Sequence, residues 1–151
     1  MSKGTHRLRR GRASQPGQVY FLTTSTYRRR PLLSDPDAAR IVMSALHWTE
    51  TAGLVQLEAA VIMPDHLHFI AELREGDLGG LMRRVKGFTA RELNELYSRS
   101  GRVWQPQYHD HALRREEALL EVIRYCLDNP VRAGLVTGFR DHPFWYCRYP
   151  I

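Results

Sequence analysis

The part of the sequence that most constrains the fold is the largely hydrophobic stretch 55–73, VQLEAAVIMPDHLHFIAEL. Its β-branched and aliphatic residues predict two strands, over about 55–63 and 66–73, and the Pro64-Asp65 pair between them is a turn signal. Strands joined by so short a turn pair antiparallel. We therefore expect an antiparallel sheet with this hairpin in its middle.

The residues before the hairpin predict one strand and one helix. Residues 18–27, QVYFLTTSTY, are β-branched and aromatic and predict the first strand. A helix that Asp35 or Asp37 can cap should follow and run to about Thr51, and Gly53 should end it. The chain thus begins with a β-α-β-β order.

The residues after the hairpin extend this order. Apolar spacing predicts a long helix over 78–97, then a short strand and loop over 103–113, and a last helix over 116–129 that Pro130 stops. The order β-α-β-β-α-β, followed by a helix, matches the split βαβ or ferredoxin-like arrangement. We expect an α+β fold, in which an antiparallel sheet has helices on one face and an additional C-terminal helix.

The length of 151 residues suits one domain. We expect a basic N-terminal arm at 1–17, the domain itself at 18–137, and an aromatic tail at 138–151 that packs back on the domain. No apolar run approaches the roughly 20 residues of a membrane helix, and no apolar segment follows the basic N-terminus as in a secretory signal. The two cysteines are too few for a disulfide framework, so a cytoplasmic location is expected.

Positive charge is concentrated at the N-terminal end. The first 30 residues contain eight basic residues and no acidic one, whereas the rest of the chain carries 14 basic and 16 acidic residues. Such an arm favours phosphate binding, because each neutralised phosphate releases counterions, and arginine suits forked contacts to phosphate or guanine. A solubilising tail is the alternative. The eight basic residues are Lys3, Arg7, Arg9, Arg10, Arg12, Arg28, Arg29 and Arg30.

Two histidines, His66 and His68, lie in the second strand of the hairpin. Residues i and i+2 of a strand share a face and lie roughly 6.5 Å apart, so both imidazoles should project from one side of the sheet. At that distance they can bind the same metal ion, in an open site of the kind that catalysis needs, with a third ligand from elsewhere. Two histidines hydrogen-bonded beneath a helix are the alternative.

The last predicted helix carries a tyrosine away from its apolar stripe. At about 100° per residue, Tyr125 points roughly 145° from the centre of that stripe, and Asn129 lies over the same face one turn later. One helix would therefore offer a phenol and an amide oxygen side by side. A surface tyrosine and a helix-ending asparagine are the alternative. The stripe comprises Leu119, Leu120, Val122, Ile123, Cys126 and Leu127.

Together these side chains suggest chemistry on a phosphodiester. Imidazoles and an amide oxygen can hold a divalent cation, and a phenol close by can act as nucleophile. A cation that polarises the phosphodiester would compensate for the weak ionisation of a phenol whose pKa is about 10. A phosphotyrosine intermediate also conserves the bond energy, so strands can be rejoined without ATP.

Four blocks of this sequence resemble the single-tyrosine HUH transposases, and most closely the REP-associated tyrosine transposases of bacteria. In chain order they read VIMPDHLHFIAEL, which holds the His-hydrophobic-His motif, then LGGLMRRVKGFTARELN, VWQPQYHDHALR and VIRYCLDNPVRAGLV. With the strand at 18–27, the resemblance covers about residues 17–137. A His-x-His motif alone has little specificity, but four blocks in this order and spacing have much more.

The resemblance implies a ferredoxin-like domain that nicks single-stranded DNA near hairpins. Tyr125 would be the nucleophile, forming a 5′-phosphotyrosine and leaving a free 3′-OH. His66, His68 and Asn129 would be the metal ligands, and the ion is expected to be Mg²⁺ or Mn²⁺. Imidazole ligands suit Mn²⁺ better than Mg²⁺, but they do not decide between them.

The resemblance also implies where DNA is held. The N-terminal arm (Arg7, Arg9, Arg10 and Arg12) and the Arg28-Arg29-Arg30 run would grip the hairpin and its guide nucleotides. The blocks between the motifs add Arg83, Arg84, Lys86 and Arg91 as candidates for phosphate contacts, for which a solvated helix face is an equally good interpretation.

Several alternatives stay open on the sequence alone. Tyr97 and Tyr108 are rival nucleophiles, although neither has the YxxxNPVRAG context of Tyr125. His109-Asp110-His111 is interpreted as shaping the loop before the last helix. In place of a nuclease, the chain could be a hairpin-binding protein without turnover, whereas an RNA-binding module fits the strand residues poorly. The protein is expected to be a monomer, or a homodimer that exchanges the tyrosine helix through a hinge in 96–104.

Overall fold

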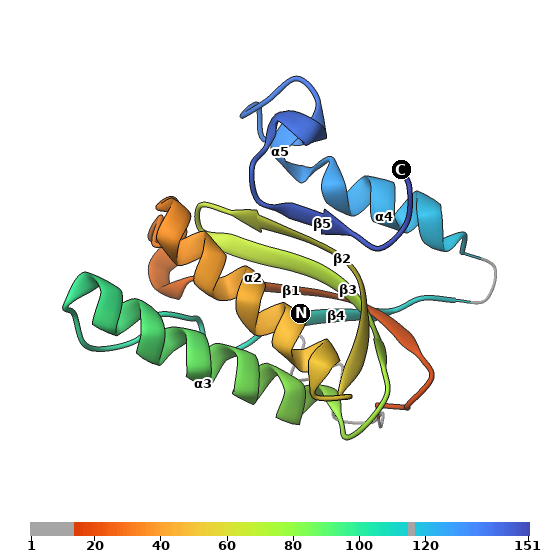
Figure 1. Cartoon of the computed structure of the whole chain (residues 1–151), viewed down its shortest axis with the longest axis horizontal. Helices are drawn as coiled ribbons and strands as arrows, with labels where there is room; N and C mark the ends of the chain where they lie inside the picture. The colour runs from red at the N-terminus through yellow and green to blue at the C-terminus, as the bar shows by residue number, and fades with distance from the viewer. Residues whose placement is uncertain (1–13, 115–116) are drawn as a thin grey trace.

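A five-stranded antiparallel sheet organises the computed structural model, which describes residues 14–114 and 117–151 (Figure 1). The strand order is β4-β1-β3-β2-β5, so β3 lies in the middle. The elements along the chain are β1 (Val19–Ser25), η1 (Tyr27–Arg29), α2 (Pro36–Thr51), β2 (Val55–Met63), β3 (His66–Leu73), α3 (Leu78–Tyr97), β4 (His109–Ala112), α4 (Leu119–Leu127), α5 (Asn129–Arg132), η2 (Phe139–Asp141) and β5 (Trp145–Cys147).

The predicted α+β, ferredoxin-like order is confirmed, and β2 and β3 form the expected antiparallel hairpin. The strand predicted within 103–113 is β4, which is only four residues long and pairs with β1 at the edge of the sheet. The turn between β2 and β3 is tied to the end of β1, since Thr26 donates its backbone N–H and its hydroxyl to the carbonyl of Asp65 at 2.9 and 3.1 Å. This connection fixes the two central strands at the end where His66 lies.

Helices α2 and α3 lie side by side on one face of the sheet (Figure 1). They bury the strand residues that alternate with the histidines, such as Leu67 and Phe69, which are at most 1% exposed. Each helix begins at an aspartate whose side chain accepts a backbone N–H, Asp35 for α2 and Asp77 for α3. Trp104 is buried behind α3, where its indole N–H donates to the hydroxyl of Thr89 at 2.9 Å.

The opposite face of the sheet is covered by α4 and the C-terminal residues (Figure 1). Ile123, Cys126 and Leu127 of α4 are fully buried against Val61 of β2 and Ile70 of β3. The sheet is thus the middle layer of three, and the last helix faces the side from which His66 and His68 project. Within the described part of the chain, no helix is long and apolar enough to span a membrane.

The predicted single helix over 116–129 is wrong in its extent. Helix α4 ends at Leu127, and Asn129 starts a separate short helix, α5, which contains Pro130 in its first turn. A proline is accepted in the first turn of a helix, because the backbone N–H that it lacks has no helical partner there. Pro130 therefore lies in the first turn of a second helix, and it does not mark the end of a single helix.

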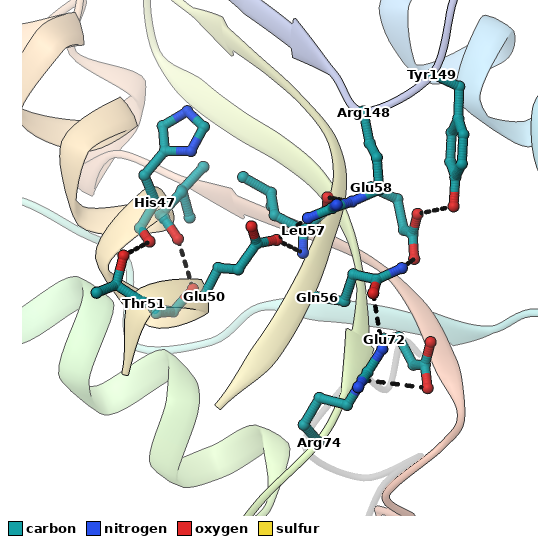
Figure 2. A network of polar contacts seen from close by, with 12 residues as sticks. His47, Glu50, Thr51, Gln56, Leu57, Glu58, Glu72, Arg74, Arg148 and Tyr149 are labelled. Atoms are coloured by element: carbon teal, nitrogen blue, oxygen red, sulfur yellow. Dashed lines mark hydrogen bonds and ion pairs between the residues drawn. The ribbon is translucent and has the colours of Figure 1, made fainter. Parts of the chain in front are cut away.

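The C-terminal residues join the sheet rather than only packing on it. Strand β5 pairs with β2, and its register begins at a bulge in β2 around Glu58. The Glu58 side chain is only 2% exposed and accepts hydrogen bonds from Tyr149 at 2.6 Å and from Gln56 at 3.1 Å (Figure 2). The hydrogen bond to Glu58 raises the pKa of Tyr149 to about 12, so the phenol stays a donor.

We predict that Tyr149→Phe lowers the free energy of unfolding by about 1–3 kcal/mol, because it leaves a buried carboxylate oxygen without its hydrogen bond. Urea denaturation followed by circular dichroism measures this change. Tyr146→Phe is the matched control, since the Tyr146 ring packs on His47 and the described residues give its hydroxyl no hydrogen bond. Equal stability of Tyr149→Phe and Tyr146→Phe would contradict the prediction.

Candidate functional site

His66 and His68 project from the face of β3 that α4 covers, with their ring centroids 4.6 Å apart. Each Nδ1 atom has a partner. His66 Nδ1 lies 2.7 Å from a carboxylate oxygen of Asp65, and His68 Nδ1 lies 2.8 Å from the hydroxyl of Thr23 on β1. Both rings are therefore held in place through Nδ1, and Nε2 is the ring nitrogen left to bind a ligand.

Burial sets the protonation of His68. It lowers the pKa of this imidazole to about 3, with smaller contributions in the same direction from His66 and from the guanidinium of Arg132. His68 is thus neutral at physiological pH, and a neutral imidazole is the form that binds metal ions.

Asn129, the first residue of α5, lies close enough to His68 for its side chain to raise the pKa of that imidazole, against the larger effect of burial. Its amide nitrogen donates to the carbonyl of Cys126 at 3.2 Å. This contact orients the amide, because only its NH₂ group can donate to a carbonyl, and it leaves the amide oxygen for the side of His68.

Tyr125 lies on the exposed side of α4, and 60% of its side chain is accessible. Its ring contacts the edge of Phe21, at 6.4 Å between centroids, and Phe21 in turn contacts His68 at 5.8 Å. The guanidinium of Arg132 lies 3.9 Å from the centre of the Tyr125 ring. Because residues seven apart share a helix face, this contact shows that α5 keeps the direction of α4 in spite of the break at Asp128.

The rival tyrosines lie in the other layer. Tyr97 and Tyr108 pack with the core beneath α2 and α3, on the face opposite His66 and His68. The Tyr97 hydroxyl donates to the carbonyl of Leu32 at 2.8 Å. The structure therefore brings only Tyr125 of these three tyrosines to the histidine face.

The arginines of 28–30 lie at the end of the sheet where His66 is. Arg29 donates to Asp65 at 3.0 Å, on the carboxylate whose other oxygen contacts His66. Arg28 and Arg29 both adopt a left-handed conformation, with φ of 57° and 56°, which costs roughly 1–2 kcal/mol per residue. Thr26 holds this turn through its hydroxyl, whose single proton is shared between the carbonyl of Arg30 at 2.7 Å and that of Asp65 at 3.1 Å. Strain at a tight turn of this kind is common near functional sites.

The other predicted DNA contacts are not gathered at this face. Arg7, Arg9, Arg10 and Arg12 lie outside the described residues, and Arg83 and Arg84 are exposed on α3, in the opposite layer. The ammonium of Lys86 donates to the carbonyl of Gln105 at 2.6 Å and to the next two carbonyls at longer distances. Burial lowers the pKa of Lys86 to about 8, and this side chain holds the loop before β4 against α3.

The sequence interpretation missed three residues of the site, namely Thr23, Asp65 and Arg132. Thr23 pairs with His68 only through the register of β1 and β3, which no short-range pattern reveals. The sequence indicates Asp65 only as a turn residue, and it places Arg132 beyond the end of the last predicted helix. The His109-Asp110-His111 run lies on β4. There, Nε2 of His111 lies 3.1 Å from the carboxylate of Glu117, just before α4 begins.

The donor set of this face is two imidazoles and one amide. No group of three His, Cys, Asp or Glu residues suited to a metal ion occurs in 14–114 or 117–151, so a metal here would rely on the Asn129 oxygen as its third protein ligand. A neutral His68 and two oriented rings fit such an ion. The sheet therefore presents paired histidines on one face, and the helix that covers this face carries an exposed tyrosine.

Comparison with known families identifies the class of protein to which the chain belongs. Residues 16–128 match the family described as "Transposase IS200 like". The chain therefore belongs to the IS200-like transposase family.

Individual relatives give the same result. The REP-associated tyrosine transposase of Escherichia coli K12 is 26% identical over 133 residues, which cover 85% of this chain and 75% of the relative. A solved structure of a REP-associated tyrosine transposase bound to a REP hairpin superposes with a TM-score of 0.72 at 26% identity, covering 89% of this chain and 79% of that one. A crystal structure of a transposase-like protein from Deinococcus radiodurans, 22% identical with a TM-score of 0.55, shares the fold over 77% of this chain and 93% of that one.

We predict that the His68 resonances stay constant between pH 5 and 8 in metal-free protein, because burial keeps this imidazole neutral until about pH 3. An NMR titration of the histidine ring protons measures this, with His68→Gln to assign the signal. The unfolded chain takes up a proton here below about pH 6.5, so stability should decline as the pH falls from 6.5 towards 3. A midpoint near 6.5 for His68 in the folded protein would contradict the prediction.

Proposed function

We propose that this protein is a metal-dependent endonuclease and strand transferase that acts on single-stranded DNA beside hairpins, with Tyr125 as its nucleophile. The observation that carries the proposal is the position of Tyr125, which is exposed on the same face of the sheet as His66 and His68, whose rings are held through Nδ1. The hairpin in the structure of the 26% identical relative supports the choice of substrate. Acting on cellular DNA would place the protein in the cytoplasm.

Nε2 of His66, Nε2 of His68 and the amide oxygen of Asn129 are proposed to hold Mg²⁺ or Mn²⁺. Such an ion supplies Lewis-acid polarisation of the phosphodiester and stabilises charge that develops on its oxygens. The protein prepares this site through Thr23 and Asp65, which fix the two rings, and through Cys126, which orients the amide. With only three protein ligands, the ion would stay accessible to the phosphodiester, as a catalytic ion must.

The chemical step is a transesterification. The Tyr125 oxygen attacks the phosphorus and loses its proton, the bond from phosphorus to the 3′-oxygen breaks, and that oxygen leaves as a 3′-OH after taking up a proton. The 5′ end is then joined to Tyr125 as a phosphotyrosine, which a 3′-OH of another strand can attack in the reverse reaction. The positive charge of Arg132 beside the Tyr125 ring favours the negative charge that develops during both steps.

The DNA strand would leave this site over the Arg28-Arg29-Arg30 turn. Arg29 lies against Asp65, the neighbour of His66, and the left-handed backbone of Arg28 and Arg29 turns the chain at this end of the sheet. The arm with Arg7, Arg9, Arg10 and Arg12 would add phosphate contacts that depend on salt concentration.

We predict that wild-type protein incubated with Mn²⁺ and a labelled single-stranded hairpin from the DNA beside its own gene forms a covalent protein–DNA adduct. Tyr125→Phe should form none, because a phenyl ring offers no oxygen to attack phosphorus. A denaturing gel separates the adduct from free DNA. Tyr97→Phe and Tyr108→Phe are matched controls and should keep it. An adduct in Tyr125→Phe would overturn the assignment, and a shifted native complex without any adduct would indicate a hairpin-binding protein.

We predict that Thr23→Val weakens Mn²⁺ binding about 10- to 100-fold, because the His68 ring loses the partner that orients it. The double variant His66→Ala with His68→Ala should show no specific binding. Isothermal titration calorimetry measures both. Thr51→Val, an exposed threonine at the end of α2, is the matched control and should bind as wild type does. Unchanged Mn²⁺ affinity in the double variant would contradict the proposed site.

A further inference from the structure

A groove of about 680 Å³ lies between α2 and α3, on the opposite side of the sheet from Tyr125. Trp48 of α2 and Phe88 of α3 line it and are 49% and 43% exposed. Large aromatic side chains are usually buried when they serve only the fold, as Trp104 is in this protein at 6% exposure. Two half-exposed aromatic rings that line one groove indicate a surface for a flat apolar ligand.

A glycine keeps the groove open. Gly87 lies in the interior of α3 and lines the groove, yet nothing lies within 4 Å of the position where a Cβ atom would be, and its φ is not in the left-handed region. Glycine inside a helix is about 1 kcal/mol less favourable than alanine. The fold does not require this glycine, so we attribute its presence to the space that it leaves in the groove.

The rim of the groove is positively charged. Arg84 and Arg91 both line it, four residues before and three residues after Phe88, so their side chains lie along the same face of α3 as that ring. Neither forms an ion pair with any residue in the described part of the chain, whereas Arg40 on α2 is neutralised by Asp37 at 2.6 Å. Uncompensated guanidinium groups beside aromatic rings match the phosphate and the base of a nucleotide.

We propose that this groove binds an unpaired nucleotide of the single-stranded DNA substrate, with its base against Trp48 and Phe88 and its phosphate held by Arg84 and Arg91. The inference rests on the proposed function for the identity of the ligand. It adds a second DNA site, separated from Tyr125 by the thickness of the sheet. A substrate that occupies both sites passes around an edge of the domain, which would anchor the DNA away from the scissile bond.

The first test reads Trp48 directly. Titration of Tyr125→Phe protein with a short oligothymidylate should quench tryptophan fluorescence, because a stacked base quenches an exposed indole. The quenching should be absent in Trp48→Phe and unchanged in Trp145→Phe. An oligonucleotide that contains 5-iodouracil should crosslink to a groove peptide identified by mass spectrometry. Saturating DNA that neither quenches Trp48 nor crosslinks to the groove would overturn the proposal.

The second test measures affinity by fluorescence anisotropy with the same oligothymidylate. Trp48→Ala should weaken binding about 5- to 100-fold. Gly87→Met, which fills the groove without removing a contact or a charge, should also weaken it. Arg84→Gln and Arg91→Gln should each reduce the salt dependence by about one phosphate contact, and Arg40→Gln is the matched control. Unchanged affinity in both Trp48→Ala and Gly87→Met would overturn the proposal.

The two proposals can fail separately. Quenching of Trp48 is measured in Tyr125→Phe protein, so it does not depend on cleavage, and absence of a wild-type adduct would count against the nuclease alone. Sedimentation velocity of wild type and Trp48→Ala without DNA tests the other occupant, a second copy of the chain. A wild-type dimer that Trp48→Ala converts to monomer would assign the groove to self-association and overturn the nucleotide site.

Discussion

The register of β3 between β1 and β2 is the constraint on which the site depends. In this register Thr23 lies opposite His68, and the alternate residues Leu67 and Phe69 are buried beneath α2 and α3. Because side chains alternate along a strand, a slip of one residue would turn both imidazoles into the apolar core under α2 and α3, and Leu67 and Phe69 towards α4. The burial of this hydrophobic face therefore also fixes the face on which the histidines lie.

The second determinant is the apolar contact of α4 with the same sheet. Ile123, Cys126 and Leu127 are buried against β2 and β3, and their burial turns Tyr125 outwards, over Phe21. Strand β5 completes this layer, and the buried Glu58 ties it to the β2 bulge (Figure 2). The nucleophile proposed here thus owes its position to residues that take no part in chemistry.

The two faces of the sheet divide the functions that we propose. One face carries the histidines, Asn129 and Tyr125, where burial and oriented hydrogen bonds prepare a small site. The other carries the α2–α3 groove, whose exposed aromatic rings and arginines suit loose, salt-sensitive contact with a strand. A thin three-layer domain can present two such surfaces to one flexible ligand.

The sequence by itself determined the order of the elements from β1 to α4, the hairpin, the shared face of His66 and His68, and the exposed side of α4, because each follows from a period of two or 3.6 residues or from a turn signal. It failed where a local rule had a second solution, as at Pro130, which lies in the first turn of α5 instead of ending the only helix. Only the tertiary structure decided that Thr23 orients His68, that Arg132 lies on Tyr125, that Tyr97 and Tyr108 belong to the opposite layer, and that Trp48 and Phe88 line one groove. Most of these relations join residues far apart in the chain and arise from strand register and helix packing, which no local pattern encodes. Arg132 and Tyr125 are only seven residues apart, but their contact depends on α5 continuing the direction of α4.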